Sequence, residues 1–214
     1  MNYEQEYSIF ETKWGYFGLA ADRKGLLKAS LPIENYQAAK TYLLQGVSKD
    51  AKKVEILYPQ LTKAIIDYYN GTCVNFKNLK YTFNWENLTD FSIRVLTACK
   101  NLEIGQTATY GQLAAMAGYP GAARAVGSVM AANRWPLIVG CHRIIRSDGQ
   151  IGNFSFCGSE TKKRMLELEK QMIKGVDHDS NKENRIAKCT GGNRALLTGN
   201  QNRKFGVPFR SVGN

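Results

Sequence analysis

The stretch TYGQLAAMAGYPGAARAVGSVMAAN, residues 109–133, decides the fold of the C-terminal half of this 214-residue chain. Thr109 followed by Gln112 fits a capping box, which satisfies the first free amides of a helix. Glycines at residues 118–121 then interrupt that helix, and a second helix is predicted from 122 to about 132. Two helices joined by a short glycine-containing turn form a helix-turn-helix, which is common both in DNA-binding proteins and in packed cores.

The second predicted helix has an unusual outer face. At 100° per residue, the side that should face the core carries Ala123, Val126 and Met130. The opposite side carries one long cation among small residues: Arg124, Gly127, Ser128 and Ala131. So small a face lets the helix backbone approach a narrow minor groove, whereas a major-groove reader usually carries several long polar side chains. Alternatively, the small residues serve tight helix packing and Arg124 extends to water.

Composition narrows the class of protein. The chain is 43% hydrophobic, which is enough for a core and excludes wholesale disorder. Twenty-nine Lys and Arg against 18 Asp and Glu leave a net charge of +11, which favours a polyanionic partner. No apolar run is long enough for a membrane span, and the acidic start is unlike a secretory signal. We therefore expect no membrane partner and a cytoplasmic location, or a nuclear one in a eukaryote.

The five cysteines are odd in number and lack Cys-x-x-Cys spacing, so neither a disulfide framework nor a metal site is predicted. Cys141 stands out, because it follows the apolar residues 135–140 and precedes His142 and Arg143. A neighbouring base and cation favour a reactive thiolate. The expectation for the remaining buried cysteines is inert packing, and it covers Cys73, Cys99 and Cys157.

The sequence leaves two possibilities for the contact between Cys141 and His142. Neighbours on an extended strand point to opposite faces, so either the chain turns there or a water carries the proton. Residues 161–173 predict a helix whose apolar face includes Glu169 and excludes Glu167. A buried carboxylate needs a partner. It either orients His142, as in a catalytic triad, or forms a structural salt bridge with an Arg such as Arg143.

The N-terminal half reads as an α/β unit. Residues 7–32 carry two turn signals at hairpin spacing, 56–69 carry a helical pattern, and 76–85 fit either a strand or an extended linker. We predict an N-terminal domain at residues 1–85, a helical domain at 86–174 and a basic, mobile tail at 175–214.

Between residues 89 and 170 the chain carries an ordered series of motifs. These are Tyr110-Gly111-x-Leu, Ala123-Arg124-Ala125-Val126-Gly127, Asn133, Cys141-His142-Arg143, Ser147-Asp148-Gly149 and Gly152-Asn153. In this series the chain resembles the O6-alkylguanine-DNA alkyltransferases. The resemblance implies a two-part α+β fold: an N-terminal ribonuclease-H-like α/β domain and a mostly helical C-terminal domain with a winged helix-turn-helix.

The resemblance also implies the activity, that of a methylated-DNA–protein-cysteine S-methyltransferase. Such a protein would act as a monomer on double-stranded DNA bearing O6-alkylguanine, without cofactor or metal. The alkyl group would pass from O6 of a flipped-out guanine, and also from O4 of thymine, to Cys141. Each molecule would act once, because the thioether product resists hydrolysis.

Site residues follow from the same resemblance. Cys141 would be the nucleophile, His142 and Glu169 would activate it, Asn133 would hold the preceding turn, and Tyr110 would rotate the phosphate and donate to the base. Arg124 would fill the gap left by the flipped nucleotide. The other DNA contacts would be Tyr110, Thr109, Ala122, Ala123, Gly127, Ser128 and Ala131. The substrate pocket would comprise Pro136, Ile144, Phe154 and Ser155.

Four positions depart from the family pattern. Gly140 and Arg134 stand where Pro is usual, Phe154 replaces a Tyr, and Phe156 replaces a small residue. From the bulk of Phe156 we predict a pocket that favours methyl over benzyl adducts.

Three other functions remain open. A non-catalytic binder of alkylated DNA would not need Cys141, and an alkylation-responsive regulator would need a sequence-specific operator. An acyl-transfer enzyme of the Cys–His type would need an oxyanion hole, which the sequence does not reveal.

Overall fold

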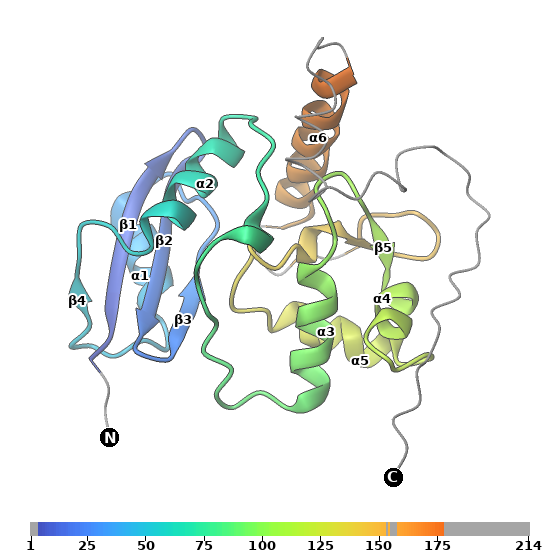
Figure 1. Ribbon diagram of the computed structural model, residues 1–214, viewed down its shortest axis with the longest axis horizontal. Helices are drawn as coiled ribbons and strands as arrows, with labels where there is room; N and C mark the ends of the chain where they lie inside the picture. Colours follow the sequence, from blue (N-terminus) through green and yellow to red (C-terminus); the bar gives the residue numbers. More distant parts are fainter. Residues whose placement is uncertain (1–3, 153, 155–157, 178–214) are drawn as a thin grey trace.

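The computed structural model describes residues 4–152, 154 and 158–177 and has a two-part α+β architecture (Figure 1). The N-terminal part is a four-stranded sheet in the order β3-β2-β1-β4. An antiparallel meander is formed by β1 (Glu6–Thr12), β2 (Gly15–Asp22) and β3 (Gly25–Ala29), and β4 (Lys52–Lys53) pairs parallel with β1. The two predicted hairpins are confirmed.

Two helices cover opposite faces of this sheet. The sequence pattern missed α1 (Tyr36–Leu44), whose Leu43 packs on one face. A Cβ at Gly18 would lie 2.7 Å from the Leu43 side chain, so glycine permits this close contact. On the other face lies α2 (Pro59–Tyr69), which begins later than the pattern at 56–69 because Pro59 favours the first helical turn.

The C-terminal part is mostly helical. It contains α3 (Asp90–Lys100), α4 (Tyr110–Met116), α5 (Ala123–Ala131) and α6 (Gly158–Asp177), with a short parallel pair of β5 (Ala108–Thr109) and β6 (Ile144–Ile145). The undecided segment 76–85 holds only the 3-10 turn η1 (Phe76–Asn78) and a single bridge from Phe83 to Leu26. The predicted tail, apart from residues 175–177 at the end of α6, lies outside the described residues.

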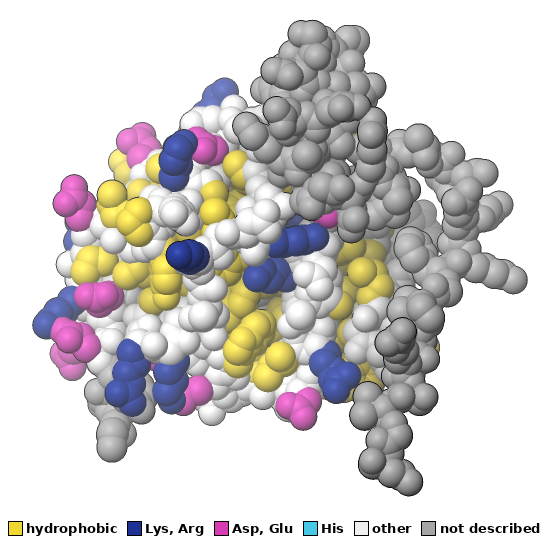
Figure 2. Space-filling view, in the orientation of Figure 1, with side chains coloured by type: hydrophobic (Ala, Val, Ile, Leu, Met, Phe, Trp, Pro, Cys, Tyr) yellow, Lys and Arg dark blue, Asp and Glu magenta, His cyan; other side chains and the backbone are white. Residues whose placement is uncertain are grey.

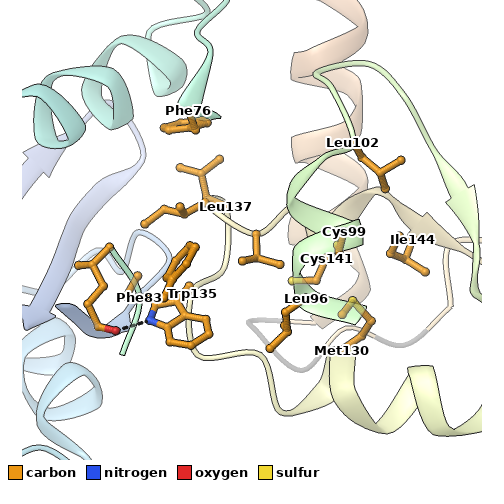
Figure 3. Close-up of a cluster of buried hydrophobic side chains, with 14 of the residues drawn as sticks. Phe76, Phe83, Leu96, Cys99, Leu102, Met130, Trp135, Leu137, Cys141 and Ile144 are labelled. Carbon is orange, nitrogen blue, oxygen red and sulfur yellow. Dashed lines mark hydrogen bonds between the residues drawn. The ribbon is translucent and has the colours of Figure 1, made fainter. Parts of the chain in front are cut away.

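One hydrophobic core joins the two parts. Trp135 is fully buried between them, 4.5 Å from the ring of Phe83, and its Nε1 donates to the carbonyl of Leu26 at 2.9 Å (Figure 3). The amide of Ala29 also donates to the carbonyl of Arg134 at 2.8 Å. The segment just before Cys141 is therefore anchored on the N-terminal sheet.

The surface carries mixed charge. On the face in Figure 2, Lys and Arg side chains are scattered among apolar and acidic ones rather than gathered in one patch. Within the part of the chain that the structure describes, no helix has the length and apolarity needed to cross a membrane.

Candidate active site

The predicted helix-turn-helix is present as α4 and α5. Thr109 Oγ1 accepts from the amide of Gln112 at 3.2 Å, and Gln112 Oε1 accepts from the amide of Thr109 at 2.7 Å. The capping box is therefore confirmed. Leu113 of this helix is buried, whereas Met116 is 53% exposed.

The outer face of α5 is open to its surroundings. Val126 and Met130 are buried, whereas Arg124, Ser128 and Ala131 are exposed. Among the residues that the structure describes, a Cβ at Gly127 would meet no atom within 4 Å. Tight packing within the chain therefore does not explain the glycine, and that alternative is wrong for Gly127. The small face is free for an external surface to approach.

Asn133 connects α5 to the cysteine. It is buried, its Oδ1 accepts from the amide of Trp135 at 3.0 Å, and its Nδ2 donates to the carbonyl of Val139 at 3.3 Å. The same Nδ2 lies 3.1 Å from Cys141 Sγ. Within this loop Leu137 has a φ of +71°, a strained conformation for a non-glycine residue. The hydrogen bonds of Asn133 and the burial of Trp135 hold the strained loop in place.

The chain turns at the cysteine rather than continuing as a strand. Residues Cys141–Arg143 form the 3-10 turn η2. Just before it, Gly140 has φ −70° and ψ 53°, and the amide of Cys141 donates to the carbonyl of Val139 at 2.7 Å, which is an inverse γ-turn. Of the two alternatives for the Cys–His contact, the structure therefore has the turn, although no hydrogen bond joins the side chains of Cys141 and His142 within the described residues.

Glu169 of α6 lies at the centre of a buried cluster. Its Oε1 is 2.7 Å from His142 Nε2 and 2.8 Å from Arg143 Nη2. The side chains of Glu169 and His142 are completely buried and that of Arg143 is 4% exposed, whereas Glu167 is exposed as predicted. The sequence allowed two contacts for Glu169, one with the His142 imidazole and one with Arg143, and the structure has both.

Electrostatics assign the proton on the imidazole. Burial alone would raise the pKa of Glu169, but Arg143 and His142 hold it well below its usual range. Because an ionised carboxylate faces Nε2, that nitrogen carries the proton and Nδ1 has the free lone pair. Burial lowers the pKa of His142 despite Glu169, so the ring is neutral at pH 7. Nδ1 is buried without a hydrogen-bond partner in the described part of the chain.

Cys141 is held as a thiol in this structure. Burial raises its pKa to about 11, against the opposing effects of the Asn133 hydrogen bond and the Lys162 charge. The expectation that neighbouring groups alone would favour a thiolate is therefore not met, because desolvation outweighs them. Loss of the thiol proton would therefore need a base, and the neutral imidazole of His142 carries a lone pair on Nδ1.

Two residues of the cluster were not predicted. Lys162 is 1% exposed and donates to the carbonyl of Ile144, and Tyr68 donates its hydroxyl to Glu169 Oε1 at 3.0 Å. Lys162 lies on the same face of α6 as Glu169, so a polar residue on that apolar stripe was an available signal. Tyr68 gave none, since a Tyr on an apolar helix face resembles ordinary core.

The remaining predicted residues are placed as follows. Tyr110 is half-buried at the start of α4, and its pKa is raised by burial and next by Cys141. Pro136 and Ile144 are buried, whereas Ala122, Ala123 and Phe154 are half-buried. Ser155 lies outside the described residues, as do Asn153, Phe156 and Cys157.

The other cysteines differ from one another. Cys99 is a buried free thiol whose pKa burial raises, as expected for inert packing. The expectation is wrong for Cys73, which is disulfide-bonded. No group of three His, Cys, Asp or Glu side chains able to hold a metal ion occurs in residues 4–152, 154 and 158–177.

Residues 90–171 match the family described as 6-O-methylguanine DNA methyltransferase, DNA binding domain. A methylated-DNA–protein-cysteine methyltransferase of Methanothermobacter thermautotrophicus is 34% identical over 137 residues, 62% of this chain and 74% of that protein. The chain belongs to the methylated-DNA–protein-cysteine methyltransferase family.

Other members of this family match to different extents. The Rattus norvegicus methyltransferase is 50% identical over 70 residues. This match covers 33% of this chain and only about a third (34%) of the length of the rat protein. The crystal structure of the Mycobacterium tuberculosis O6-methylguanine methyltransferase has a TM-score of 0.63 at 27% identity and covers 78% of this chain and 94% of that one. A structure of the same mycobacterial protein in complex with DNA matches equally well.

Gly140 departs from the family pattern without disturbing the backbone. Its φ of −70° is one that Pro would adopt, so the turn does not depend on the ring. A Cβ at this position would lie 2.9 Å from Arg143 Nη1. The glycine therefore leaves room for the guanidinium that pairs with Glu169.

Proposed function

We propose that this protein repairs DNA by transferring an alkyl group from O6 of guanine to Cys141 in a single stoichiometric reaction. The observation that carries the proposal is the buried Cys141 thiol in a loop held by Asn133, followed by a neutral His142 whose Nε2 is fixed by Glu169. Family membership supports the reaction class, and the mycobacterial complex supports DNA as the partner. O4 of thymine would be a second substrate position.

The outer face of α5 is proposed to enter the minor groove. Its small residues would let the backbone approach the groove, and exposed Arg124 would occupy the space of the extruded nucleotide. Thr109 and Tyr110 at the start of α4, with Ala122, would contact the backbone beside it. Flipping is needed because a thiol that is 4% exposed cannot reach O6 within stacked DNA.

The reaction is a single displacement. As the bond between Cys141 Sγ and the alkyl carbon forms, the bond from that carbon to O6 breaks. The thiol proton would pass to His142 Nδ1 through a water molecule bound between the two side chains. Tyr110 would donate its proton to the departing guanine, which leaves as a neutral base, and the proton held by His142 would return to the Tyr110 oxygen through solvent. The product is a stable thioether.

Finer features are part of the same proposal. The sheet with α1 and α2 would be the ribonuclease-H-like domain, with 1–85 and 86–174 as domain limits. The β5–β6 pair would support a winged helix-turn-helix, and the protein would act as a monomer. Pro136, Ile144 and Phe154 would line the base pocket with Ser155, which lies outside the described residues.

Intact-mass measurement after incubation with a duplex containing O6-methylguanine tests the reaction. We expect a gain of one methylene in the wild type and in Cys99→Ser, whose cysteine is also buried and free, but none in Cys141→Ser. Binding to the damaged duplex without a mass gain in the wild type would instead identify a non-catalytic binder.

A further inference from the structure

A tyrosine of the N-terminal part reaches the reactive cluster of the C-terminal part. Tyr68 lies near the end of α2 and is fully buried. Its hydroxyl donates to Glu169 Oε1 at 3.0 Å across 101 residues of sequence. Tyr68 lies outside residues 90–171, the part that matches the family's DNA-binding domain.

Tyr68 completes the set of donors around the carboxylate. Oε1 also faces His142 Nε2 and Arg143 Nη2, while Oε2 accepts from the amide of Gly105 at 3.0 Å and from Arg143 Nε at 3.0 Å. A carboxylate has about four lone-pair sites, so these groups satisfy it on every side. The orientation of Glu169, and through it that of His142, is fixed by a residue from each part of the molecule.

The hydroxyl remains a donor under all ordinary conditions. Burial raises the pKa of Tyr68 well above its usual value, and the charge of Glu169 raises it further. The ring is held by a T-shaped contact with Tyr69 at 5.1 Å and a tilted contact with Phe76 at 6.2 Å. Tyr68 therefore presents a protonated, fixed O–H to the carboxylate.

We propose that Tyr68 is a positioning residue for alkyl transfer: its hydroxyl orients Glu169, and thereby the imidazole of His142 that takes the proton of Cys141. This inference rests on the proposed function. It makes the N-terminal part a contributor to the chemistry rather than only a support for the fold.

The test compares Tyr68→Phe with Tyr69→Phe in the full-length chain. Both variants lose one hydroxyl from buried rings of the same helix, but Tyr69 packs against Trp14 and Phe17. The measurement is the second-order rate of Cys141 methylation by O6-methylguanine duplex, as a function of pH. For Tyr68→Phe we expect a rate about tenfold lower at pH 7, the size of losing one hydrogen bond to a charged group in the transition state. Duplex affinity should not change.

The pH profile separates positioning from a structural role. Without the tyrosine O–H, more of the carboxylate charge acts on the imidazole, so the pKa of His142 rises and the acid limb of the rate profile moves to higher pH. A change in thermal stability with an unchanged profile, or equal effects of the two substitutions, would overturn the inference. Absence of methylation in the wild type would instead overturn the proposed function.

Discussion

The helices α5 and α6 place their charged residues in opposite ways. On α5 the apolar side chains Val126 and Met130 are buried, and the single cation, Arg124, projects from a face of small exposed residues. On α6 the buried face itself carries Lys162 and Glu169. Under the proposed function the difference reflects two requirements. A helix face that enters a DNA groove would have to be accessible and carry small side chains, whereas groups that move a proton would have to be desolvated and held by partners.

The largest expected effect concerns the buried charge of α6. Replacing Glu169 by Gln leaves the Arg143 guanidinium, 4% exposed, without its counter-ion. Breaking a buried pair in this way should lower the free energy of unfolding by about 3 kcal/mol and abolish methylation. Urea denaturation measures the first effect. Glu167→Gln, on the exposed side of α6, should change stability by less than about 0.5 kcal/mol; similar losses in both variants would contradict the assignment.

The next effect concerns the cation of α5. Arg124→Ala should slow methylation by O6-methylguanine in duplex DNA by about 10- to 100-fold. This factor corresponds to losing part of the few kcal/mol needed to flip the nucleotide out of the duplex. Reaction with the free modified base should be unaffected, because no nucleotide is extruded. Arg94→Ala, which removes an exposed arginine from α3, is the matched control. Equal losses with duplex and free base would disprove the intercalating role.

A third effect is a pH dependence of stability. The pKa of His142 is lowered in the folded protein, so below its ordinary value of 6.5 the unfolded chain binds a proton that the folded chain does not. The free energy of unfolding is therefore highest above that pH and falls as the pH is lowered, with a limiting slope of about 1.4 kcal/mol per pH unit. Glu169, with its lowered pKa, adds a loss below its ordinary 4.5.

Unfolding measured between pH 7 and 5 tests this linkage. In His142→Gln the free energy of unfolding should depend less on pH. In His178→Gln, which removes the only other histidine of the sequence, the pH dependence should be the same as in the wild type. A slope unchanged in His142→Gln would show that the imidazole is not buried in its neutral form.

The smallest effect has opposite signs for folding and binding. Gly127→Ala should stabilise the protein by about 0.5–1 kcal/mol, because glycine is a poor helix former and no atom of the described chain lies within 4 Å of an added Cβ. The same methyl group should weaken binding to duplex DNA if α5 lies deep in a groove. Unchanged affinity, measured by fluorescence anisotropy at fixed salt, would argue against close approach of this face.

Local pattern predicted much of the fold. The hairpins, the capping box at Thr109, the limits of α5 and the inward direction of Glu169 follow from turn chemistry and from helical or strand periodicity. Helix α1 was missed, and the segment 76–85 could not be assigned, because their conformation depends on packing against the sheet rather than on their own spacing.

The sequence by itself determined the residue types of the site, since Cys141, His142, Arg143 and the small face of α5 are local features of the chain. Only the tertiary structure decided how they act. The chain turns at Gly140, and Glu169 contacts both His142 and Arg143. Tyr68, 101 residues away in the sequence, donates to the same carboxylate. The physical reason is that a buried charge takes its partners from whatever elements the core brings together, and spacing along the chain does not encode those distances.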